Sequence, residues 1–452
     1  MATDKLTVTV DGVTDIPRLP GQSVRVWDGT PPDTTRMDIY SVYHDVSGND
    51  FEAVAKLSGS NWQMKYFRIT GEDHHTTIRD LDNGADRRIE LLELGFNSTV
   101  QLISTRAKHI TGWDGDKHDV QLGSGYTASV SLDAEVNILR TGSGDVGSIR
   151  TNGKSTIEIG DVYVGSVSTG NGNDKVTTGA GWVEAIVTRD GNDIVKIGTG
   201  SAALVRTGDG NDIVNATSGW VEMISTGDGK DTVTIGKHGA GAVWLSDGND
   251  TIKVRDLTDG NNGVQINGGR GNDTLDFGGF SKGIHFSLDE RAAYQNVAAS
   301  NPNSTKPLSG WFSESSIENL SGTKKGDTFT GDAGANKLIG RGGNDDLYGF
   351  GGKDMLIGGT GRDVLDGGRG NDMLRGNGGP DVFVFGKKSG TDTVKDYRDG
   401  TDILRLDGHT GGFADLTISK KAGDKVIVHD GGTIVLDGKA GVNLTASDFD
   451  FV

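Results

Sequence analysis

The feature that most constrains the fold of this chain is a glycine-rich nonapeptide that recurs without interruption in its second half. The stretch GRGGNDDLYGFGGKDMLIGGTGRDVLDGGRGNDMLRG, residues 340–376, places an aspartate at every ninth position, at Asp345, Asp354, Asp363 and Asp372. Glycine loses more backbone entropy on folding than any other residue, and stacked carboxylates repel one another. Such loops therefore fold only if something else stabilises them.

The same spacing of nine residues extends on both sides of this stretch. The loop position is filled by Asp327, Asn336, Asp345, Asp354, Asp363, Asp372 and Asp381. Two residues after each comes a large apolar side chain, from Phe329 and Leu338 through to Phe383. This pattern predicts a six-residue loop followed by a very short strand whose middle residue points inward. Two such units would make one turn of a flattened parallel roll.

Glycine in these loops lets backbone carbonyl groups converge where a Cβ atom would interfere. Together with an aspartate from each of two stacked loops, these carbonyls would form an oxygen-only cage for a hard divalent cation, for which Ca²⁺ is the obvious candidate. The expected carboxylate ligands are Asp327, Asp345, Asp354, Asp363, Asp372 and Asp381. The expected carbonyl ligands are the first and third residues of the four central loops, namely Gly340, Gly342, Gly349, Gly351, Gly358, Thr360, Gly367 and Arg369.

Residues 322–385 closely resemble the RTX family, whose haemolysin-type nonapeptide repeats bind calcium. The resemblance implies that loops two repeats apart share one Ca²⁺ ion. Residues 340–345 would then pair with 358–363, and residues 349–354 with 367–372. Asn336 departs from the pattern, so a cage built on its loop would carry one negative charge less, and we expect it to bind calcium more weakly.

A second and longer period lies upstream of the nonapeptides. Acidic loops such as VRTGDGNDIV recur every 19 residues at Asp174, Asp193, Asp212, Asp231 and Asp250, and Asp273 follows after 23. We interpret each unit as about one turn of a β-solenoid, with calcium loops stacked along one edge and no metal at the other edge. Ser155 stands in the acidic position of an earlier, degenerate loop.

The predicted fold class is all-β: a parallel β-solenoid or β-roll with stacked Gly-Asp calcium loops and a β-rich N-terminal cap. A cap is expected because an open solenoid end exposes unpaired strand edges. The expected segments are a β-rich cap or small domain at 1–98, a solenoid of 19-residue repeats at 99–276, a junction at 277–320, the nonapeptide β-roll at 321–385, and a C-terminal cap with a secretion signal at 386–452.

Composition favours a repeat protein over a compact globule. Of 452 residues, 73 are glycine and only 33% are hydrophobic, a thin supply of core that repeats tolerate because each unit buries its apolar residues against its neighbours. The formal net charge of −18 argues against nucleic acid and anionic membrane surfaces as partners, and it favours cations.

The sequence also suggests how the chain is exported. It contains no cysteine, which fits an exported protein that does without disulfides. Its start, MATDKLTVTVDG, has no apolar segment of signal-peptide length, and no apolar run approaches the ~20 residues of a membrane span. We therefore expect neither an N-terminal signal peptide nor membrane insertion.

The C-terminal segment carries a further resemblance. DVFVFGKKSGTDTVKDYRDG resembles the segment that closes the roll in RTX proteases and alginate epimerases. The final Asp450, Phe451 and Val452 resemble the uncleaved signal that type I (ABC) exporters of Gram-negative bacteria read, while the alternative is an ordinary last strand. Since cytosolic calcium is too scarce to fill weak extracellular-type cages, such a chain would stay unfolded for export and fold outside the cell.

Two histidine-containing segments offer other metal ligands. They are GEDHHTT, with Asp73, His74 and His75, and HITGWDGDKHD, with His109, Asp114, Asp116, His118 and Asp119. Neither has the His-Glu-x-x-His spacing of a metalloprotease helix, and a cysteine-based zinc site is impossible. We favour surface loops for both segments.

Aromatic and basic residues also recur in the 19-residue register. Trp182 and Trp220 are two such turns apart with Ser201 halfway, so all three should lie at one corner. A column of exposed rings could stack on sugars, but we favour packing at the corner. The same choice applies to three arginines that precede threonine, Arg140, Arg150 and Arg206, for which pairing with carboxylates is favoured over binding an acidic polysaccharide.

Three classes of function remain. The favoured one is a secreted calcium-binding structural protein, namely a surface-layer, matrix or adhesion component that associates with itself or with cell-surface polysaccharide. The alternative is a polysaccharide-acting exoenzyme of lyase or epimerase type on a β-helix scaffold. A membrane-active toxin is disfavoured because the long apolar segment it would need is missing.

Overall fold

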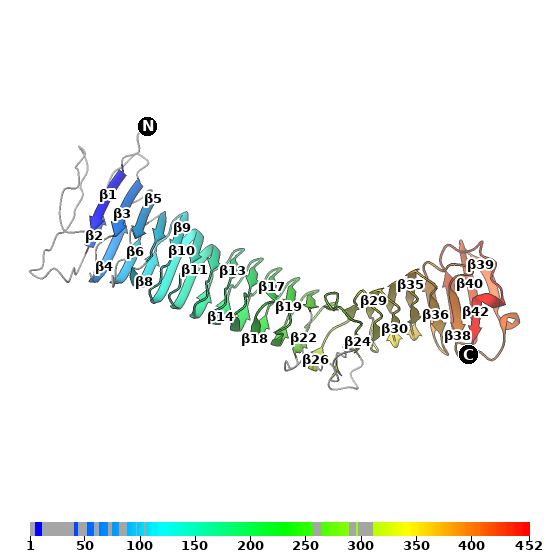
Figure 1. The fold of residues 1–452 in the computed structure, drawn as a ribbon. Helices are drawn as coiled ribbons and strands as arrows, with labels where there is room; N and C mark the ends of the chain where they lie inside the picture. The colour runs from blue at the N-terminus through cyan, green and yellow to red at the C-terminus, as the bar shows by residue number, and fades with distance from the viewer. Residues whose placement is uncertain are drawn as a thin grey trace, which may run out of the picture. The chain divides into compact units, whose positions relative to one another are not determined.

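In the computed structural model of the protein, the described residues are 5–10, 40–43, 52–57, 63–70, 75–80, 88–95, 97–103, 105–255, 264–288, 295–296 and 311–452. They fall into two compact units, Met1–Asp228 (unit 1) and Gly229–Val452 (unit 2). Both are built almost entirely of short strands that pair in parallel from one turn to the next (Figure 1). The parallel β-solenoid predicted from the sequence is therefore confirmed.

Unit 1 contains two parallel ladders, each with one strand per turn. The first ladder consists of β1 (Lys5–Val10), β3 (Glu52–Leu57), β5 (His75–Asp80), β7 (Ser98–Gln101), β9 (Lys117–Gln121), the second halves of β10 (Thr127–Arg140) and β11 (Val146–Glu158), β13 (Lys175–Thr177), β15 (Ile194–Lys196) and β17 (Ile213–Ala216). The second consists of β2 (Tyr40–Tyr43), β4 (Gln63–Thr70), β6 (Arg88–Leu94), β8 (Arg106–Gly112), the first halves of β10 and β11, β12 (Val164–Ser168), β14 (Trp182–Val187), β16 (Ser201–Arg206) and β18 (Trp220–Ser225).

Strand pairing in unit 1 does not change at residue 98, where the sequence suggested the end of a cap. β1, β3 and β5 belong to the same parallel ladder as β7 and β9. Among the described strands, the turns before residue 98 are therefore further solenoid turns. Their register was lost in the sequence because the segments between them are longer and follow no fixed period.

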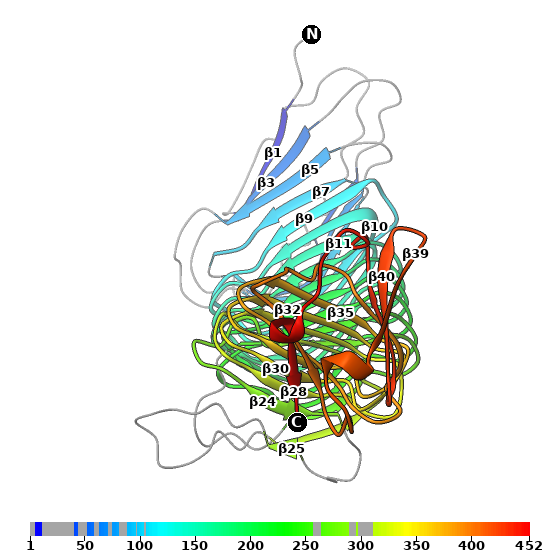
Figure 2. The ribbon, with the colours of Figure 1, turned by 90° about the vertical axis from the view of Figure 1, so that its right-hand side faces the viewer.

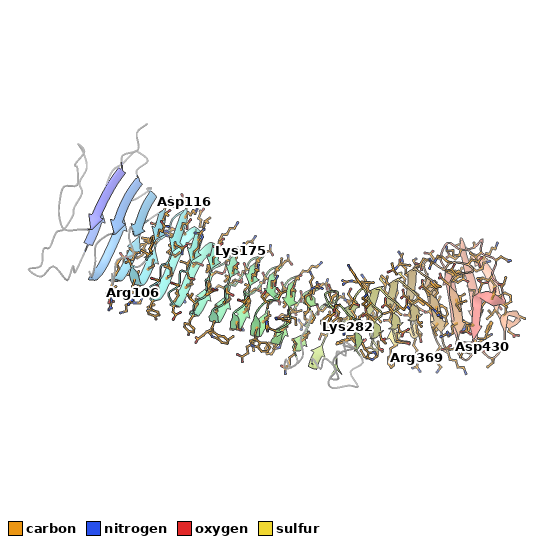
Figure 3. All side chains as sticks on the ribbon, viewed as in Figure 1. Arg106, Asp116, Lys175, Lys282, Arg369 and Asp430 are labelled. Atoms are coloured by element: carbon orange, nitrogen blue, oxygen red, sulfur yellow. The ribbon has the colours of Figure 1, made fainter. Side chains whose placement is uncertain are left out.

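The core of each turn comes from alternation along very short strands. In β13, β15 and β17 the middle valines, Val176, Val195 and Val214, stack as a fully buried column while their neighbours face outward. Figure 3 labels one of these outward residues, Lys175. β-Branched side chains suit this pleated, half-buried surface. A strand of three residues is sufficient here because the turns on either side complete the burial.

Unit 2, taken by itself, is built in the same way and has one ladder that runs through all of it. It consists of β19 (Thr232–Ile235), β21 (Thr251–Val254), β23 (Thr274–Asp276), β27 (Asn319–Ser321), β29 (Lys337–Gly342), β32 (Met355–Thr360), β35 (Met373–Gly378), β37 (Gly390–Val394) and β41 (Gly432–Leu436). Two short strands, β31 (Gly351–Gly352) and β34 (Arg369–Gly370), pair beside it.

The second face of unit 2 is made by two successive ladders. The first contains β20 (Ala240–Trp244), β22 (Gln265–Asn267) and β26 (Trp311–Ser315), which also pairs with β25 (Gln295–Asn296). The second contains β24 (His285–Ser287), β28 (Thr328–Thr330), β30 (Asp346–Tyr348), β33 (Val364–Asp366), β36 (Val382–Phe385), β38 (Ile403–Leu406) and β42 (Phe449–Phe451). This exchange falls within residues 277–320, the segment predicted as a junction.

The nonapeptide block packs as its spacing predicts. Seven apolar side chains, two residues after each loop position, are fully buried in two stacks: Phe329, Leu347, Leu365 and Phe383 in one, and Leu338, Leu356 and Leu374 in the other. Burying a leucine side chain contributes roughly 1.5–3 kcal/mol, so these stacks are the main apolar core of the roll.

The C-terminal end of unit 2 interrupts the parallel pattern. β39 (Thr417–Lys421) and β40 (Asp424–His429) form an antiparallel hairpin that leads into β41 (Figure 2). Two 3₁₀ turns, η1 (Phe413–Asp415) and η2 (Ala446–Asp448), flank these strands. In the part of the chain that the structure describes, no helix has the length and apolarity to cross a bilayer.

Candidate metal centre

The nonapeptide aspartates lie in loops that stack directly on one another in unit 2. Because Asp346 in β30 pairs with Val364 in β33, the preceding residues, Asp345 and Asp363, are neighbours one turn apart. The backbone N–H of Asp345 donates a hydrogen bond to Oδ1 of Asp363 at 2.9 Å. One carboxylate oxygen of each aspartate therefore joins two successive turns.

This bond repeats along both edges of the roll. The donor and acceptor pairs are Asp327 to Asp345 (2.7 Å), Asp345 to Asp363 (2.9 Å) and Asp363 to Asp381 (3.1 Å) on one edge, and Asn336 to Asp354 (2.8 Å) and Asp354 to Asp372 (2.8 Å) on the other. The two edges thus carry one column of buried loop aspartates each.

The second carboxylate oxygen separates the four central nonapeptide aspartates from Asp327 and Asp381. In Asp345, Asp354, Asp363 and Asp372, Oδ2 is buried and accepts no hydrogen bond from the described residues. A buried carboxylate oxygen without a partner is costly, so native proteins normally provide a donor or a cation. These four residues are the aspartates of the uninterrupted nonapeptide stretch. In the longer repeats, Oδ2 of Asp174, Asp193, Asp250 and Asp273 is likewise buried and accepts no hydrogen bond from the described residues.

Backbone oxygens converge on the same places. A Cβ atom on Gly340 would overlap Oδ2 of Asp345 and would lie 2.7 Å from the carbonyl oxygen of Gly358 in the next turn. On the other edge, a Cβ on Gly349 would overlap Oδ2 of Asp354 and lie 2.5 Å from the carbonyl oxygen of Gly367. Glycine is therefore required because carboxylate and carbonyl oxygens occupy the space beside it.

The electrostatics of the columns oppose ionisation in the absence of a cation. Burial raises the pKa of Asp345 to about 8, and the charges of Asp327 and Asp363 add to the rise. Burial likewise raises the pKa of Asp354 to about 7 and that of Asp372 to about 6. A bound divalent cation would reverse this effect by favouring the charged carboxylates.

The first and last predicted aspartates of the first column, Asp327 and Asp381, have partners within the protein. Oδ2 of Asp327 accepts the backbone N–H of Thr323 at 2.6 Å, and its Oδ1 accepts that of Ile284 at 2.7 Å. At the other end, the guanidinium of Arg398 lies 3.4 Å from Oδ2 of Asp381. Sequence reasoning grouped both aspartates with the central four, but their surroundings differ.

Three further residues belong to the columns and were not predicted. Asp392 accepts the backbone N–H of Asp372 at 3.0 Å, and Asp402 accepts that of Asp381 at 3.1 Å. Arg398 lies 3.2 Å from Asp402 and also donates to the carbonyl oxygen of Gly379, so its cation stands at the end of the column. The sequence pattern did not include these residues because the spacing between stacked residues, 18 in the repeats, becomes 20 after Asp372 and 21 after Asp381.

Asn336 keeps the framework of the loop without its charge. Its Oδ1 accepts the backbone N–H of Asp332 at 2.8 Å, and its Nδ2 donates to the carbonyl oxygen of Glu318 at 3.1 Å. The weaker calcium binding expected for this loop stays a prediction.

The 19-residue turns of unit 1 carry the same backbone bond. Ser155 N–H donates to Oδ1 of Asp174 (2.6 Å), Asp174 to Asp193 (2.8 Å), and Asp193 to Asp212 (2.7 Å). The predicted loop aspartates of unit 1 therefore do stack in one column. Burial raises the pKa of Asp174 to about 6, as it does for the nonapeptide aspartates.

The residue five positions before each of these aspartates differs from the nonapeptide loops. It is a buried threonine, Thr169, Thr188 or Thr207, where the nonapeptides have glycine. The hydroxyl of Thr169 donates to the carbonyl oxygen of Thr188 at 3.1 Å, and that of Thr188 to Thr207 at 3.2 Å. A threonine side chain thus fills the place beside the carboxylate and occupies the carbonyl that glycine leaves accessible in the nonapeptide loops.

The aspartates at the start of unit 2 form an intermediate group. Asp231 N–H donates to Asp250 at 2.7 Å, and Asp250 N–H to Asp273 at 2.8 Å. Asp273 has glycine five positions before it, and a Cβ on Gly268 would overlap both its Oδ2 and the carbonyl oxygen of Ser316. Its surroundings therefore match those of the nonapeptide aspartates.

Hard oxygen donors of this kind suit Ca²⁺. The residues that fit the cation best are Asp345, Asp354, Asp363 and Asp372, with carbonyls of the adjoining glycines. Within the described residues, no three His, Asp or Glu side chains converge on one point, so the fit depends on backbone carbonyls. In Figure 3, Arg369, the third residue of its loop, is labelled on the outer side of unit 2, and only its backbone is a candidate ligand.

Comparison with known families agrees with this geometry. The model of the RTX calcium-binding nonapeptide repeat (4 copies) matches residues 258–281, 321–349 and 348–383. The chain therefore carries RTX calcium-binding repeats, as its sequence indicated, and several Ca²⁺ ions are its cofactors. Proteins with these repeats are typically secreted.

Other comparisons add little. No curated protein matches the chain. Among solved structures, it is similar to the extracellular lipase LipA from Serratia marcescens, with 19% sequence identity and a TM-score of 0.26. The match covers 59% of this chain and 45% of the lipase chain, so this chain spans less than half of that enzyme. Such a likeness supports no inference about activity.

The histidine segments do not assemble a site in the described residues. His118 is buried, its Nε2 lies 2.7 Å from the carbonyl oxygen of Trp113, and burial lowers its pKa. His109 Nδ1 pairs with the hydroxyl of Ser129, while Asp119 pairs with Arg140 at 2.8 Å. This last contact is the carboxylate pairing favoured for Arg140. Asp73 and His74 lie outside the described residues, as does the side chain of His75.

Proposed function

We propose that the protein is an exported RTX protein of a Gram-negative bacterium that folds on extracellular calcium and serves a structural role at the cell surface, as a surface-layer, matrix or adhesion component. The observation that carries the proposal is the pair of aspartate columns in unit 2. In four consecutive loops, a buried carboxylate oxygen has no hydrogen-bond donor in the described protein. Beside it lies a glycine, and a Cβ atom at that position would overlap the surrounding oxygens.

These columns explain how calcium would control folding. Without a cation, the buried carboxylates resist ionisation, and the glycines favour the unfolded chain. Extracellular sites of this chemistry bind Ca²⁺ at roughly 10⁻⁴ to 10⁻³ M, far above cytosolic levels. Because the cation binds only the stacked loops, its binding free energy becomes folding free energy outside the cell.

Export through a type I (ABC) machinery suits the same property, because a C-terminal nonapeptide block that stays unfolded without calcium can enter a narrow channel. Asp450 and Phe451 of the proposed signal lie in β42, in which Asp450 accepts a hydrogen bond from Nε of Arg405 at 2.9 Å. Such a strand would form only after transport, when β38 is in place.

The proposal is tested by removing one aspartate from each column. The double variant Asp354→Ala/Asp363→Ala should shift the calcium midpoint of folding upward by about tenfold or more, because each substitution removes a ligand charge. The control Asp190→Ala/Asp209→Ala removes two exposed loop aspartates of unit 1 and should leave the midpoint unchanged.

Far-UV circular dichroism and light scattering on one calcium titration provide both readouts. For the wild-type chain, strand signal should rise together with large particles that a chelator disperses, as a surface assembly requires. An unchanged midpoint in the double variant would contradict calcium-driven folding. A compact monomer at every calcium concentration would contradict the surface-assembly role alone.

A further inference from the structure

Aromatic side chains form a column on the outer surface of unit 1. Trp182, Ser201 and Trp220 are the first residues of β14, β16 and β18 and pair directly. The register of β10, β11, β12 and β14 continues this row through the residues just before the first three strands, Tyr126, Asp145 and Tyr163. Four of the six are aromatic. Successive members lie one strand spacing apart, about 4.8 Å.

These rings are not part of the core. Tyr126 is 56% exposed, Trp182 41% and Tyr163 40%, and Trp220 is half-buried. The corner packing favoured for Trp182 from sequence is therefore wrong. Large aromatic side chains aligned in one exposed row are unusual on a soluble surface and typically mark a binding site.

Small residues next to the column leave its rings accessible. The adjoining outward positions in the first three strands are Ala128, Gly147 and Gly165. A Cβ on Gly147 would lie 3.2 Å from the hydroxyl of Tyr126, and one on Gly165 would lie 3.7 Å from that of Tyr163. Both tyrosine side chains therefore lie over glycine backbone, so no neighbouring side chain covers them from this side.

Carboxylates accompany the rings. Tyr163 donates its hydroxyl to Oε1 of Glu184 at 2.6 Å, which fixes the orientation of the ring. Glu184 and Glu222 are exposed on the strands that carry Trp182 and Trp220, and Asp145 lies within the column itself. The surface thus combines aromatic faces with hydrogen-bond acceptors of negative charge.

The aromatic rings and carboxylates of this column favour a carbohydrate as its binding partner. Flat aromatic faces stack on the C–H faces of sugar rings, and carboxylates accept hydrogen bonds from sugar hydroxyls. Polyanions such as uronate polymers and nucleic acids would be repelled by the same carboxylates. A row of rings repeated by the solenoid matches an extended chain of repeating units better than a single small ligand.

We infer that the column from Tyr126 to Trp220 binds an extended, neutral polysaccharide. This goes beyond the calcium-dependent structural role, because it assigns a partner to unit 1, which lies outside the nonapeptide block. The carboxylates Glu184 and Glu222 hydrogen-bond the hydroxyl groups of the polymer, and the rings carry most of the contact area.

Binding is measured with the calcium-loaded full chain by isothermal titration calorimetry, using cellohexaose and laminarihexaose as neutral probes and an alginate hexamer as the anionic one. At least one neutral probe should bind, and alginate should bind more weakly. In Trp182→Ala/Trp220→Ala the affinity should fall by about tenfold or more. The matched control, Trp113→Ala/Trp244→Ala, removes two exposed tryptophans outside the column and should retain full affinity.

A gain-of-affinity variant guards against misfolding of the double mutant. Ser201 lies between Trp182 and Trp220, so Ser201→Trp would complete the row and should tighten binding by about threefold or more. The inference is overturned if neither neutral hexamer binds, if alginate binds more tightly, or if the column variants and the control behave alike. Calcium-dependent folding is recorded on the same samples, so its failure is distinguished from loss of sugar binding.

Discussion

At the scale of single residues, the loop aspartates couple calcium to protons. In the folded, metal-free chain, burial raises the pKa of Asp345 to about 8 and that of Asp354 to about 7, well above the usual value of a carboxyl group. A raised pKa in the folded state means that folding takes up protons. The resulting stabilisation is fully present below about pH 4 and is lost as the pH rises through about 6 to 8.

The metal-free chain should therefore be more stable at pH 5 than at pH 8, while the calcium concentration needed for folding should be higher at pH 5, because protons compete for the carboxylates. Thermal melts in a chelator and calcium titrations at both pH values measure the two effects. Asp345→Asn should weaken the pH dependence. A metal-free chain that melts at a higher temperature at pH 8 would contradict the burial of these carboxylates.

The residue scale also shows what the sequence could not reveal about the site. The aspartates from 327 to 381 are equivalent in spacing, yet Thr323 and Arg398 provide partners for the two end residues, Asp327 and Asp381. Thr323 lies in the loop of Asp327 itself, whereas Arg398 lies in a segment without the period, so no pattern of nine residues could have identified that arginine. The four central aspartates were predictable as one group because their surroundings consist of repeats alone.

At the scale of the loop, the residue five positions before the aspartate determines what lies beside the carboxylate. Glycine brings a carbonyl and a carboxylate together, whereas threonine fills the place and bonds the next turn. The prediction that the aspartates of the 19-residue turns also hold calcium did not take this difference into account, and it stays a prediction. The signal was present in TGNGND and TGDGND, where threonine precedes the first glycine.

Adding a single methyl group should test the glycine position. In Gly358→Ala the new Cβ would overlap Oδ2 of Asp363, so the calcium midpoint should rise by about tenfold or more. Gly386→Ala is the matched control, because a Cβ there meets nothing within 4 Å. The midpoint is read from far-UV circular dichroism during calcium titration. Equal calcium midpoints for the two variants would show that the space between Gly358 and Asp363 is not a cation site.

The strands were predictable to different degrees. The 19-residue and nonapeptide turns were found because each strand has the same length and the same inward residue, as in the column Val176, Val195 and Val214. The turns before residue 98 were not, since nothing in β1, β3 and β5 fixes their spacing. Parallel pairing at long separation depends on neighbouring turns, which a local pattern does not record.

At the scale of the whole molecule, the threonine-containing loops of the 19-residue turns and the glycine-containing nonapeptide loops stabilise different parts of the chain. In unit 1, threonine hydroxyls and valine columns link successive turns, although Oδ2 of Asp174 and Asp193 is buried there without a hydrogen-bond donor. In the nonapeptide block of unit 2, glycine replaces these threonines, and we expect the turns to depend on calcium to neutralise buried carboxylates. The central claim is therefore that calcium controls one part of the solenoid and not the other.

Hydrogen–deuterium exchange with mass spectrometry, followed across a calcium titration of the full chain, tests this claim most directly. Amides of β12, β14 and β16 should be protected at every calcium concentration. Amides of β30, β32 and β33 should become protected only as calcium rises through about 10⁻⁴ to 10⁻³ M. Protection of the nonapeptide strands in a chelator, or protection of both sets at one calcium midpoint, would contradict the account.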